Sequence, residues 1–482
     1  MRCFLFCLLI GLSAASGANR IAVGLTSGKT PIEALSTAET AADLPTVLLI
    51  GGLDGSDQSS QAIAREFERY RGKKFRLIAI PRANPAKATL AFPPSGRAYA
   101  EHPEAHYLWR WIGVQAPDLV LIAGEDYGLA EALNNNSVTG IGRIPARRSV
   151  ALPKQIPRSE ASLEIRRRLA RTPRQVADEL ARFYGRDELN EAVYINSVAL
   201  IGQLRLGHLD EVVRATAAFT SGSKDSLARA TSSHLSGHLI FGELAERTGD
   251  PRYVQLVRKA ADLGFTESGA MKESMPLHNE MSDSVFMGCP ILAKAGKLTH
   301  DRRYFEMALR HMQFMQKLCL RPDGIYRHSP LDQAAWGRGN AFPALGLALT
   351  LSDIPAADPV FPEILRSYRA HMEALARFQD ESGMWREVID LPGSYREFTA
   401  TAMIGVAMKR GIRNGWLDAK IYQPLVDRAW SGVSRRTGSD GRLIDVCEST
   451  GKQPSVEGYL NRLAILDRDP RGGAMALLFA TE

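Results

Sequence analysis

Short apolar runs alternate with helical patterns in the first part of the chain. Residues 59–70 and 103–115 carry apolar positions at helical spacing, and strand-like runs stand before, between and after them. These apolar runs span residues 46–52, 75–81 and 118–124. Strands that alternate with helices indicate a parallel or mixed sheet. The pattern therefore predicts a small α/β domain over residues 46–133.

From residue 175 to residue 482 the pattern is helical throughout. One apolar face recurs at steps of three and four residues and consists of Tyr304, Met307, Ala308, His311, Met312, Met315 and Leu318. Turn pairs recur every fifty to sixty residues, at Asp323-Gly324, Ser382-Gly383 and Asp440-Gly441. A repeat of this length with two helices indicates stacked helical hairpins. Six hairpins fit the segment and would close into an all-α (α/α)6, or six-hairpin, toroid. The periodicity alone leaves an open solenoid as the alternative.

Residues 134–174 separate these two regions and are strongly basic. Within them, residues 141–174 contain nine Arg and one Lys against two Glu, so their local charge exceeds the net +7 of the whole chain. We expect a solvated basic linker, and an attraction for acidic polysaccharide or membrane phosphate is the alternative. Because the basic residues gather in this linker, no nucleic acid is expected as a partner.

The composition is that of a globular protein. Of the 482 residues, 45% are hydrophobic and 23% are charged, which excludes a disordered chain. Residues 1–18 combine one Arg, an apolar run and terminal small residues, as secretory signal peptides do. We therefore expect a cleaved signal peptide and a secreted or periplasmic protein without stable membrane insertion. An uncleaved membrane anchor is the alternative, although the run is short for a membrane span.

Three cysteines would remain after removal of the leader: Cys289, Cys319 and Cys447. An odd number of scattered thiols forms no complete disulfide framework. The sequence also has no CxxC pair that would indicate a structural zinc site. No metal and no cofactor are therefore expected, and the pattern does not predict an oligomeric state.

Five segments of the helical region resemble, in the same order, motifs of glycoside hydrolase families 88 and 105. These families are the unsaturated glucuronyl and rhamnogalacturonyl hydrolases. The segments are NEMSDSVFM (279–287), AWGRGNAF (335–342), GMWREV (383–388), the helix over 394–412 and DPRGGA (469–474). The resemblance covers roughly residues 200–482. It implies the same (α/α)6 toroid that the periodicity favours.

The resemblance also implies a substrate and a reaction. The substrate is an oligosaccharide whose non-reducing end carries a 4,5-unsaturated uronic acid, left by a polysaccharide lyase. Asp283 matches the acid and base of the family, which protonates C4 of the vinyl ether and then deprotonates the water that adds at C5. The apolar neighbours of Asp283 would keep this carboxyl protonated through desolvation. Without the motif, a helix Asp that faces solvent or caps a turn is the alternative.

The resemblance implies that four further residues bind the substrate: Arg338, Trp336 and Phe342 of these motifs, and His328, which follows the turn at Asp323-Gly324. A guanidinium such as that of Arg338 pairs with a carboxylate in a fork, although a structural salt bridge is the alternative. Trp336 and Phe342 offer the sugar an apolar face, and core packing explains them equally. His328 resembles a histidine of the family that contacts substrate, and a polar loop histidine is the alternative.

His234 and Trp385 complete the candidate binding residues. The family carries a second Asp about fifty residues before the acid, but residues 232–237 contain no carboxylate. His234 is the candidate replacement there, with a structural role as the alternative. Trp385 has the same two interpretations. The missing Asp leaves both substrate identity and activity open, and the short loop between His328 and Arg338 leaves substrate identity open.

The α/β region resembles a degenerate zinc carboxypeptidase in LLIGGLDGSD (48–57), RANP (82–85) and DLVLIAG (118–124). Asp54, Asp57 and Gly124 stand where that family has its His, Glu and His ligands. Two carboxylates without imidazole make a poor zinc site. The resemblance implies a non-catalytic domain that supports the toroid, contacts glycan or binds a partner. An unrelated α/β domain is the alternative.

We therefore expect a hydrolase that removes the unsaturated uronic acid from oligosaccharides. A non-catalytic carbohydrate-binding or scaffold protein on the same toroid is the alternative, and the missing second Asp favours it. Another uronate-processing enzyme is a third possibility, because a fold does not fix a function.

Overall fold

The computed structural model describes residues 19–37 and 44–482, and these residues separate into two compact units. Unit 1 contains the described residues up to Ser95 together with His102–Glu164. Unit 2 contains Gly96–Glu101 and Ile165–Glu482. The signal peptide predicted at 1–18 lies outside the described residues.

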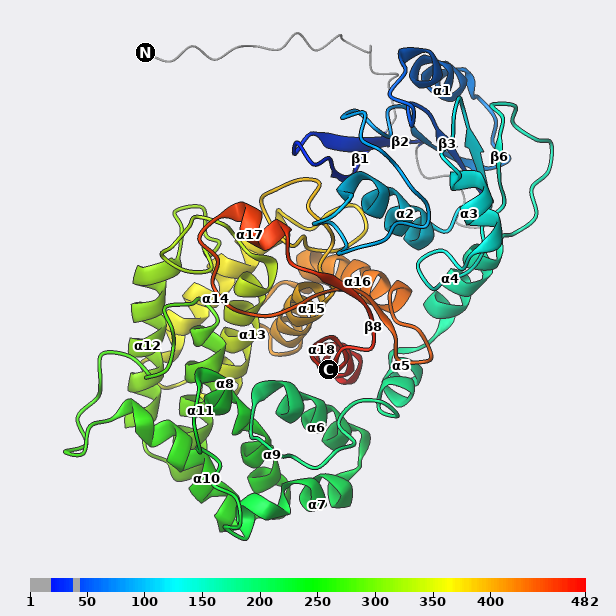
Figure 1. Cartoon of the computed structure of the whole chain (residues 1–482). Coiled ribbons are helices and arrows are strands. Elements are labelled where there is room, and N and C mark those ends of the chain that lie inside the picture. The colour runs from blue at the N-terminus through cyan, green and yellow to red at the C-terminus, as the bar shows by residue number, and fades with distance from the viewer. Residues whose placement is uncertain (1–18, 38–43) are drawn as a thin grey trace, which may run out of the picture. The chain divides into compact units, whose positions relative to one another are not determined.

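Unit 1 is built on a mostly parallel sheet, drawn in blue to cyan in Figure 1. Among the described residues the sheet has six strands in the order β1-β2-β4-β3-β5-β6. They are β1 Asn19–Leu25, β2 Pro31–Ser36, β3 Thr46–Ile50, β4 Arg76–Ile80, β5 Leu119–Ile122 and β6 Ala146–Arg148. The neighbouring helices are α1 Asp57–Arg69, α2 Pro103–Gln115 and α3 Leu129–Asn135. The three predicted apolar runs are β3, β4 and β5, whose buried side chains fill the core of the sheet.

The sheet also extends beyond the region that the pattern indicated. β1 and β2 form an antiparallel hairpin that joins β4, and β6 pairs in parallel with β5, with Val120 opposite Ala146. β6 lies inside the stretch 134–174 that was expected to be a linker. Its two exposed arginines, Arg147 and Arg148, gave no apolar signal, because a short charged strand is typical of a sheet edge.

The basic stretch is ordered, and at least half of its ten basic residues form ion pairs with carboxylates among the described residues. Helix α4, Glu160–Ala170, follows β6 within it. Five of its arginines have carboxylate partners in the structure, in the pairs Arg143–Glu160, Arg148–Glu125, Arg158–Asp118, Arg171–Glu179 and Arg174–Asp178. These ion pairs reduce the charge that the stretch offers to an anionic partner.

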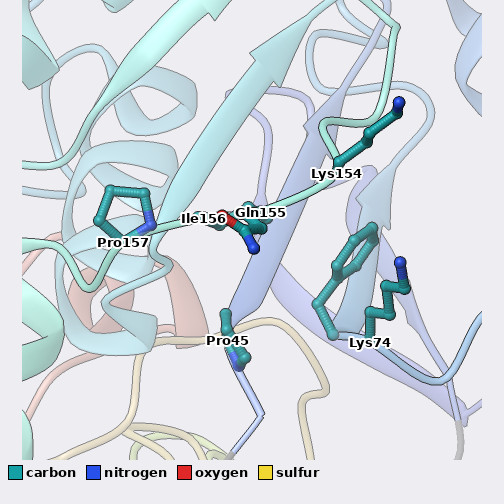
Figure 2. Close-up of a pocket in the computed structure, with 7 residues that line it drawn as sticks. Pro45, Lys74, Lys154, Gln155, Ile156 and Pro157 are labelled. Carbon is teal, nitrogen blue, oxygen red and sulfur yellow. The ribbon is translucent and has the colours of Figure 1, made fainter.

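Two cavities lie in unit 1. One, of about 470 Å³, is lined by side chains from the segments that lead into β3 and β4 and from residues 154–157 (Figure 2). Its charged lining groups are Lys74 and Lys154. The other, of about 490 Å³, lies beyond the carboxyl ends of β3 and β5 and contains Asp54 and Gly124.

The second cavity is where the carboxypeptidase resemblance would place a metal. Asp54 Oδ1 accepts hydrogen bonds from Ser56 N and Ser59 Oγ, and Asp57 pairs with Arg82. Within residues 19–37 and 44–482, no three His, Cys, Asp or Glu side chains are grouped closely enough to hold a metal ion. Asp54 thus bonds to the residues at the start of α1, and Asp57 forms an ion pair with Arg82.

Unit 2 is helical, and its elements run from green to red in Figure 1. Its helices are α5 Pro173–Leu180, α6 Tyr194–Leu206, α7 Leu209–Thr220, α8 Ser232–Gly237, α9 Leu239–Thr248, α10 Pro251–Ala261, η1 Asp262–Gly264, α11 Ser284–Thr299, α12 Arg303–Cys319, α13 Gly337–Asp353, α14 Phe361–Ala376, α15 Phe398–Arg413, α16 Ala419–Arg435, α17 Val456–Leu460 and α18 Pro470–Thr481. A short antiparallel pair, β7 Leu443–Cys447 and β8 Ala464–Asp467, precedes α18. The prediction of a small α/β region followed by a large helical region is confirmed.

Six helices of unit 2 form a closed circuit. α6, α8, α11, α13, α15 and α18 pack each against the next, and α18 packs back on α6 (Figure 1). α11, α13 and α18 are buried on nearly all sides, as their mostly apolar and small residues allow. At Gly346 of α13 a Cβ atom would lie 2.7 Å from Phe286 Cα, so glycine permits the close approach of α13 to α11.

The outer helices show the one-sided pattern expected from the sequence. α12 buries Tyr304, Met307, Ala308, His311, Met312 and Met315 on one face. The three repeated turns also share a conformation, because Gly324, Gly383 and Gly441 all have φ near +80°, at 86°, 81° and 79°. This left-handed backbone favours glycine and ends each turn in the same way.

None of the helices in the described part of the chain combines the length and the apolar composition that crossing a membrane requires.

Candidate active site

Asp283 occupies the N-cap position of α11 and is 3% exposed. The residue before it anchors this end of the helix. Ser282 N donates to His328 O at 2.9 Å, and Ser282 Oγ donates to Gly339 O at 2.6 Å. These bonds tie the start of α11 to the loop at residue 328 and to the start of α13. The carboxyl of Asp283 does not cap its own helix and is therefore left for other contacts.

His328 lies directly beside this carboxyl and is 1% exposed. Its Nε2 is 3.2 Å from Asp283 Oδ1, and neither atom has an aligned hydrogen-bond partner among the described residues. On the other side of the ring, Nδ1 is 2.8 Å from the hydroxyl of Tyr459, which accepts from Gln453 N at 3.0 Å. This arrangement favours a Tyr459 hydroxyl that donates to Nδ1, and therefore a proton on Nε2 facing Asp283.

Trp336 forms the next layer of the site. Its ring centre is 4.5 Å from that of His328, and the guanidinium carbons of Arg338 and Arg462 lie 4.6 and 4.5 Å from the Trp336 ring centre. The indole Nε1 donates to Glu387 Oε1 at 2.9 Å. Cation–π contacts and this hydrogen bond hold the fully buried ring in one orientation.

Arg338 is also fully buried, and both of its terminal nitrogens are used. Nη1 donates to Thr399 Oγ1 at 3.1 Å and to Cys447 O at 2.9 Å, while Nη2 donates to Ser449 O. Burial by itself lowers the pKa of Arg338, but electrostatic attraction to neighbouring groups, Cys447 first and then Glu397, outweighs burial and raises the pKa above its ordinary value. The guanidinium therefore stays charged inside the protein.

Two acidic side chains support this charge. Glu397 caps α15 by accepting from Thr399 N, and its Oε1 also accepts from Cys447 N at 2.9 Å. Glu387 Oε1 lies 3.2 Å from Cys447 Sγ. Burial, together with the nearby Glu397 charge, raises the pKa of Glu387 to about 7.

Buried polar atoms without hydrogen-bond partners gather around Asp283 and Trp336. Within the described ranges they include Tyr194 OH, Asp283 Oδ1, His328 Nε2, Arg338 Nε, Arg462 Nε and Nη1, and Arg471 Nε. An unsatisfied buried polar group costs about 1–3 kcal/mol, so such atoms mark a place where a polar ligand or water completes the bonding. Most of these atoms are donors, which suits an anionic ligand.

The remaining sequence candidates occupy different surroundings. Phe342 is fully buried between Phe286 and Tyr194, with ring centres 5.4 and 5.5 Å away. His234 lies on α8, which packs against α11; its Nδ1 accepts from Thr231 N, and burial lowers its pKa. Trp385 is buried, and its Nε1 donates to Leu375 O at 2.8 Å.

The structure therefore brings Asp283, His328, Trp336 and Arg338 together directly, with Phe342 behind them on the α11 side. Trp385 is linked to Glu397 through its backbone: its carbonyl accepts from Glu397 N at 2.8 Å, and its N–H donates to Thr401 Oγ1, which donates to Glu397 O. No contact of His234 with the other candidates is among those described here. These placements do not test which residues touch substrate, so the binding roles stay predictions, as does the expectation that no metal is needed.

Several residues of the site were missed by the sequence analysis. Tyr459 and Arg462 lie more than 120 residues from His328 in a segment without a repeat or motif, so no local signal indicated them. Glu387 and Glu397 lie inside segments that resembled the family, but nothing in their spacing marks them as buried. Cys447 was counted only as a scattered thiol.

The comparisons with known proteins identify relatives of the helical region. The family model described as Glycosyl Hydrolase Family 88 matches residues 209–482. An unsaturated rhamnogalacturonyl hydrolase of Bacillus subtilis, YesR, is 28% identical over 243 residues, which cover 46% of this chain and 68% of that protein. An unsaturated 3S-rhamnoglycuronyl hydrolase of an Alteromonas species is 24% identical over 209 residues, covering 40% of this chain and 50% of that protein.

Solved structures share the fold of the helical unit. A family 105 glycoside hydrolase of C. acetobutylicum aligns with a TM-score of 0.55 at 19% identity, covering 64% of this chain and 98% of that chain. A possible GH105 member of Klebsiella pneumoniae aligns with a TM-score of 0.54 at 22% identity, covering 69% and 95%. The family model spans more than half of the sequence and includes every candidate site residue. The chain therefore belongs to glycosyl hydrolase family 88 and is a glycoside hydrolase.

Proposed function

We propose that the protein releases a 4,5-unsaturated uronic acid from the non-reducing end of oligosaccharides left by a polysaccharide lyase. The observation that carries this proposal is Asp283, a buried carboxyl whose Oδ1 faces His328 beside a group of buried guanidiniums. The names of the two curated relatives, both unsaturated uronyl-type hydrolases, support the same substrate class.

The reaction is a hydration followed by hydrolysis. Protonated Asp283 delivers its proton to C4 of the C4=C5 double bond, and the positive charge that develops at C5 is shared with the ring oxygen. The resulting carboxylate takes a proton from a water molecule as that water adds to C5. The hemiketal then opens to a C5 ketone, and the aglycone leaves from C1. One carboxyl therefore acts as acid and then as base, unlike the carboxylate pair of ordinary glycosidases.

His328 fits this cycle as the neighbour that responds to the charge of Asp283. With a proton on Nε2, the ring stabilises the carboxylate form that follows C4 protonation. With Asp283 protonated, the same contact weakens. The 3.2 Å separation without alignment is typical of a catalytic contact that tightens when substrate binds.

The uronate carboxylate is the group that the buried arginines would receive. Arg338 keeps Nε, Arg462 keeps Nε and Nη1, and Arg471 keeps Nε without partners among the residues described. Because both terminal nitrogens of Arg338 are already engaged, we propose that Arg338 shares the carboxylate with Arg462 rather than forming a two-pronged pair alone. Charge-assisted hydrogen bonds of this kind are roughly twice as strong as neutral ones.

We further propose that the helical unit is the six-hairpin toroid. The closed circuit of α6, α8, α11, α13, α15 and α18 supports six inner helices. α7, α10, α12, α14 and α16 each pack on one of these or on α9, and α5 packs on α18, so each inner helix has an outer neighbour. An open solenoid would leave α18 without α6. Export through the segment 1–18 likewise stays a proposal, which N-terminal sequencing of the mature protein would test.

The experiment that tests the function follows the ultraviolet absorbance of the C4=C5 bond in a panel of lyase-generated unsaturated disaccharides. Asp283→Asn keeps the shape of the side chain but removes the acid, and Asp210→Asn, at an exposed position of α7, is the matched control. Loss of absorbance with the wild type and the control, but not with Asp283→Asn, supports the proposal. A folded wild-type protein that consumes none of the panel would overturn it and favour a binding or scaffold role.

A further inference from the structure

A short segment from the loop between β4 and α2 packs within unit 2. Residues Gly96–Glu101 belong to unit 2, although the residues on both sides of them along the chain belong to unit 1. Tyr99 is its central side chain and is 6% exposed. The segment lies outside residues 209–482, which the family model matches, so its contacts are a feature of this chain in addition to the matched family region.

Three contacts hold the segment in place. The Tyr99 ring stacks on Tyr395, with ring centres 4.8 Å apart and an angle of 12°. The Tyr99 hydroxyl donates to Asp445 Oδ1 at 3.1 Å. Arg97 Nη2 lies 3.0 Å from Glu448 Oε1. Tyr99 has φ +68°. This left-handed backbone conformation costs a non-glycine residue about 1 kcal/mol or more, and the three contacts offset that cost.

Two of these contacts bracket the strand that holds Arg338. Cys447 is the last residue of β7. Asp445 lies in the strand two residues before it, and Glu448 follows it directly. The Cys447 carbonyl accepts from Arg338 Nη1 at 2.9 Å, and the next acceptor of Arg338 is Ser449 O. A shift of this strand would therefore move both carbonyl acceptors of the guanidinium.

The third contact supports the same network from the other side. The carbonyl of Tyr395 accepts from Glu387 N at 2.8 Å, and Glu387 Oε1 in turn accepts from Trp336 Nε1. Burial raises the pKa of Tyr395 well above its ordinary value, and the neighbouring acidic side chains add to that effect. The Tyr99 ring thus stacks on Tyr395, which is hydrogen-bonded to the partner of Trp336. The Tyr99 hydroxyl bonds to β7, which supplies a carbonyl acceptor of Arg338.

We propose that Tyr99 is a positioning residue for substrate binding, which fixes the Arg338 guanidinium and the Trp336 ring by holding β7 and Tyr395 against each other. The inference rests on the proposed function, because it assumes that Arg338 receives the uronate carboxylate. It gives Tyr99 an effect on substrate affinity and little effect on proton transfer at Asp283, since the contacts of Tyr99 lead to Arg338 and Trp336, whereas Asp283 pairs with His328.

The test compares Tyr99→Ala, Tyr99→Phe and a control, Tyr127→Ala, at an exposed tyrosine. For Tyr99→Ala we expect KM for the best unsaturated disaccharide to rise about tenfold, with kcat within about twofold of the wild type. Tyr99→Phe keeps the stacked ring and loses only the hydroxyl, so its KM falls between the two. A purely structural role would lower the amount of folded enzyme, and therefore the apparent kcat, while KM stayed the same. An unchanged KM overturns the inference.

A second readout does not depend on activity. Cys447, Cys289 and Cys319 are all buried free thiols, so native-state alkylation by iodoacetamide, followed by peptide mass spectrometry, reports local opening at each. Loosening of β7 in Tyr99→Ala should raise the labelling rate of Cys447 at least fivefold relative to Cys289 and Cys319. Equal increases at all three sites indicate general destabilisation and overturn the inference. If the wild type turns over no substrate, the proposed function fails. The labelling rate of Cys447 still decides whether Tyr99 holds β7 in place.

Discussion

His328 Nε2 lies 3.2 Å from Asp283 Oδ1, and Tyr459 contacts the opposite nitrogen of the same ring. The three side chains come from the N-terminus of α11, the loop before α13 and the short helix α17. Tyr459 therefore fixes the ring orientation and the proton position from a segment far from Asp283 in the sequence. The Tyr459 hydroxyl therefore acts on the proposed catalytic acid Asp283 indirectly, through the orientation of His328.

Tyr459→Phe removes that hydroxyl and keeps the ring. We expect kcat on an unsaturated disaccharide to fall roughly fivefold, because the hydrogen bond that orients His328 is worth about 1 kcal/mol. Tyr127→Phe, at an exposed tyrosine, should leave kcat unchanged. Steady-state kinetics of the two variants test the prediction, and equal kcat values would show that His328 does not depend on Tyr459.

Arg338→Lys keeps the positive charge and loses the fork of donors. Lysine cannot reach Thr399 Oγ1, Cys447 O and Ser449 O together. We expect the free energy of unfolding to fall by about 3 kcal/mol and KM to rise at least tenfold. Urea unfolding and kinetics measure the two effects. Arg366→Lys, on the exposed side of α14, is the control, and a similar small effect in both variants would remove Arg338 from the site.

The raised pKa of Glu387 implies that the free energy of unfolding depends on pH. Its pKa in the folded protein is raised to about 7, above the ordinary value of a glutamate, so the folded state holds a proton that the unfolded state releases. This contribution is fully present below about pH 4.5 and is lost as the pH rises through about 7, by an amount on the order of 3 kcal/mol.

Glu387→Gln should remove this part of the pH dependence. The difference in free energy of unfolding between variant and wild type should shift in favour of the variant from pH 5 to pH 8. Thermal or urea unfolding at several pH values measures it, with Glu267→Gln at an exposed position as the control. Parallel stability curves for the wild type and Glu387→Gln would show that this carboxyl does not hold the extra proton.

Trp385→Phe separates packing from substrate contact. Trp385 is fully buried and donates to Leu375 O, so the change leaves a cavity and removes this hydrogen bond, while Phe378 N still donates to the same carbonyl. We expect a stability loss of about 2 kcal/mol with KM unchanged for the folded enzyme. A rise in KM of fivefold or more without a loss of stability would instead place Trp385 against the sugar.

Elements with a strong local signal could be predicted from the sequence. The buried strands β3, β4 and β5 are continuous apolar runs, and α12 shows a clear three-to-four-residue period. The β1–β2 hairpin was not predicted. The edge strand β6 was not predicted either, because two of its three residues are arginines and the strand is defined by its pairing with β5. Local pattern therefore found the core and missed the edges.

The site divides in the same way. Asp283, Trp336 and Arg338 stand in short segments with recognisable motifs, and His328 follows a recognisable Asp-Gly turn. Tyr459, Arg462 and Tyr99 reach the site only through tertiary contacts across more than 100 residues. The occupation of both terminal nitrogens of Arg338 by backbone carbonyls also has no sequence signal, since any residue supplies a carbonyl.

The closure of the helical circuit by α18 has a consequence for biosynthesis. The apolar surface of α6 is made early in translation, whereas α18, its partner on one side, is the final helix in the sequence. At Gly202 of α6 a Cβ atom would lie 2.5 Å from Leu477, so this face fits α18 closely. Until residues 470–481 emerge from the ribosome, the face of α6 that receives Leu477 stays uncovered and is a natural binding site for chaperones.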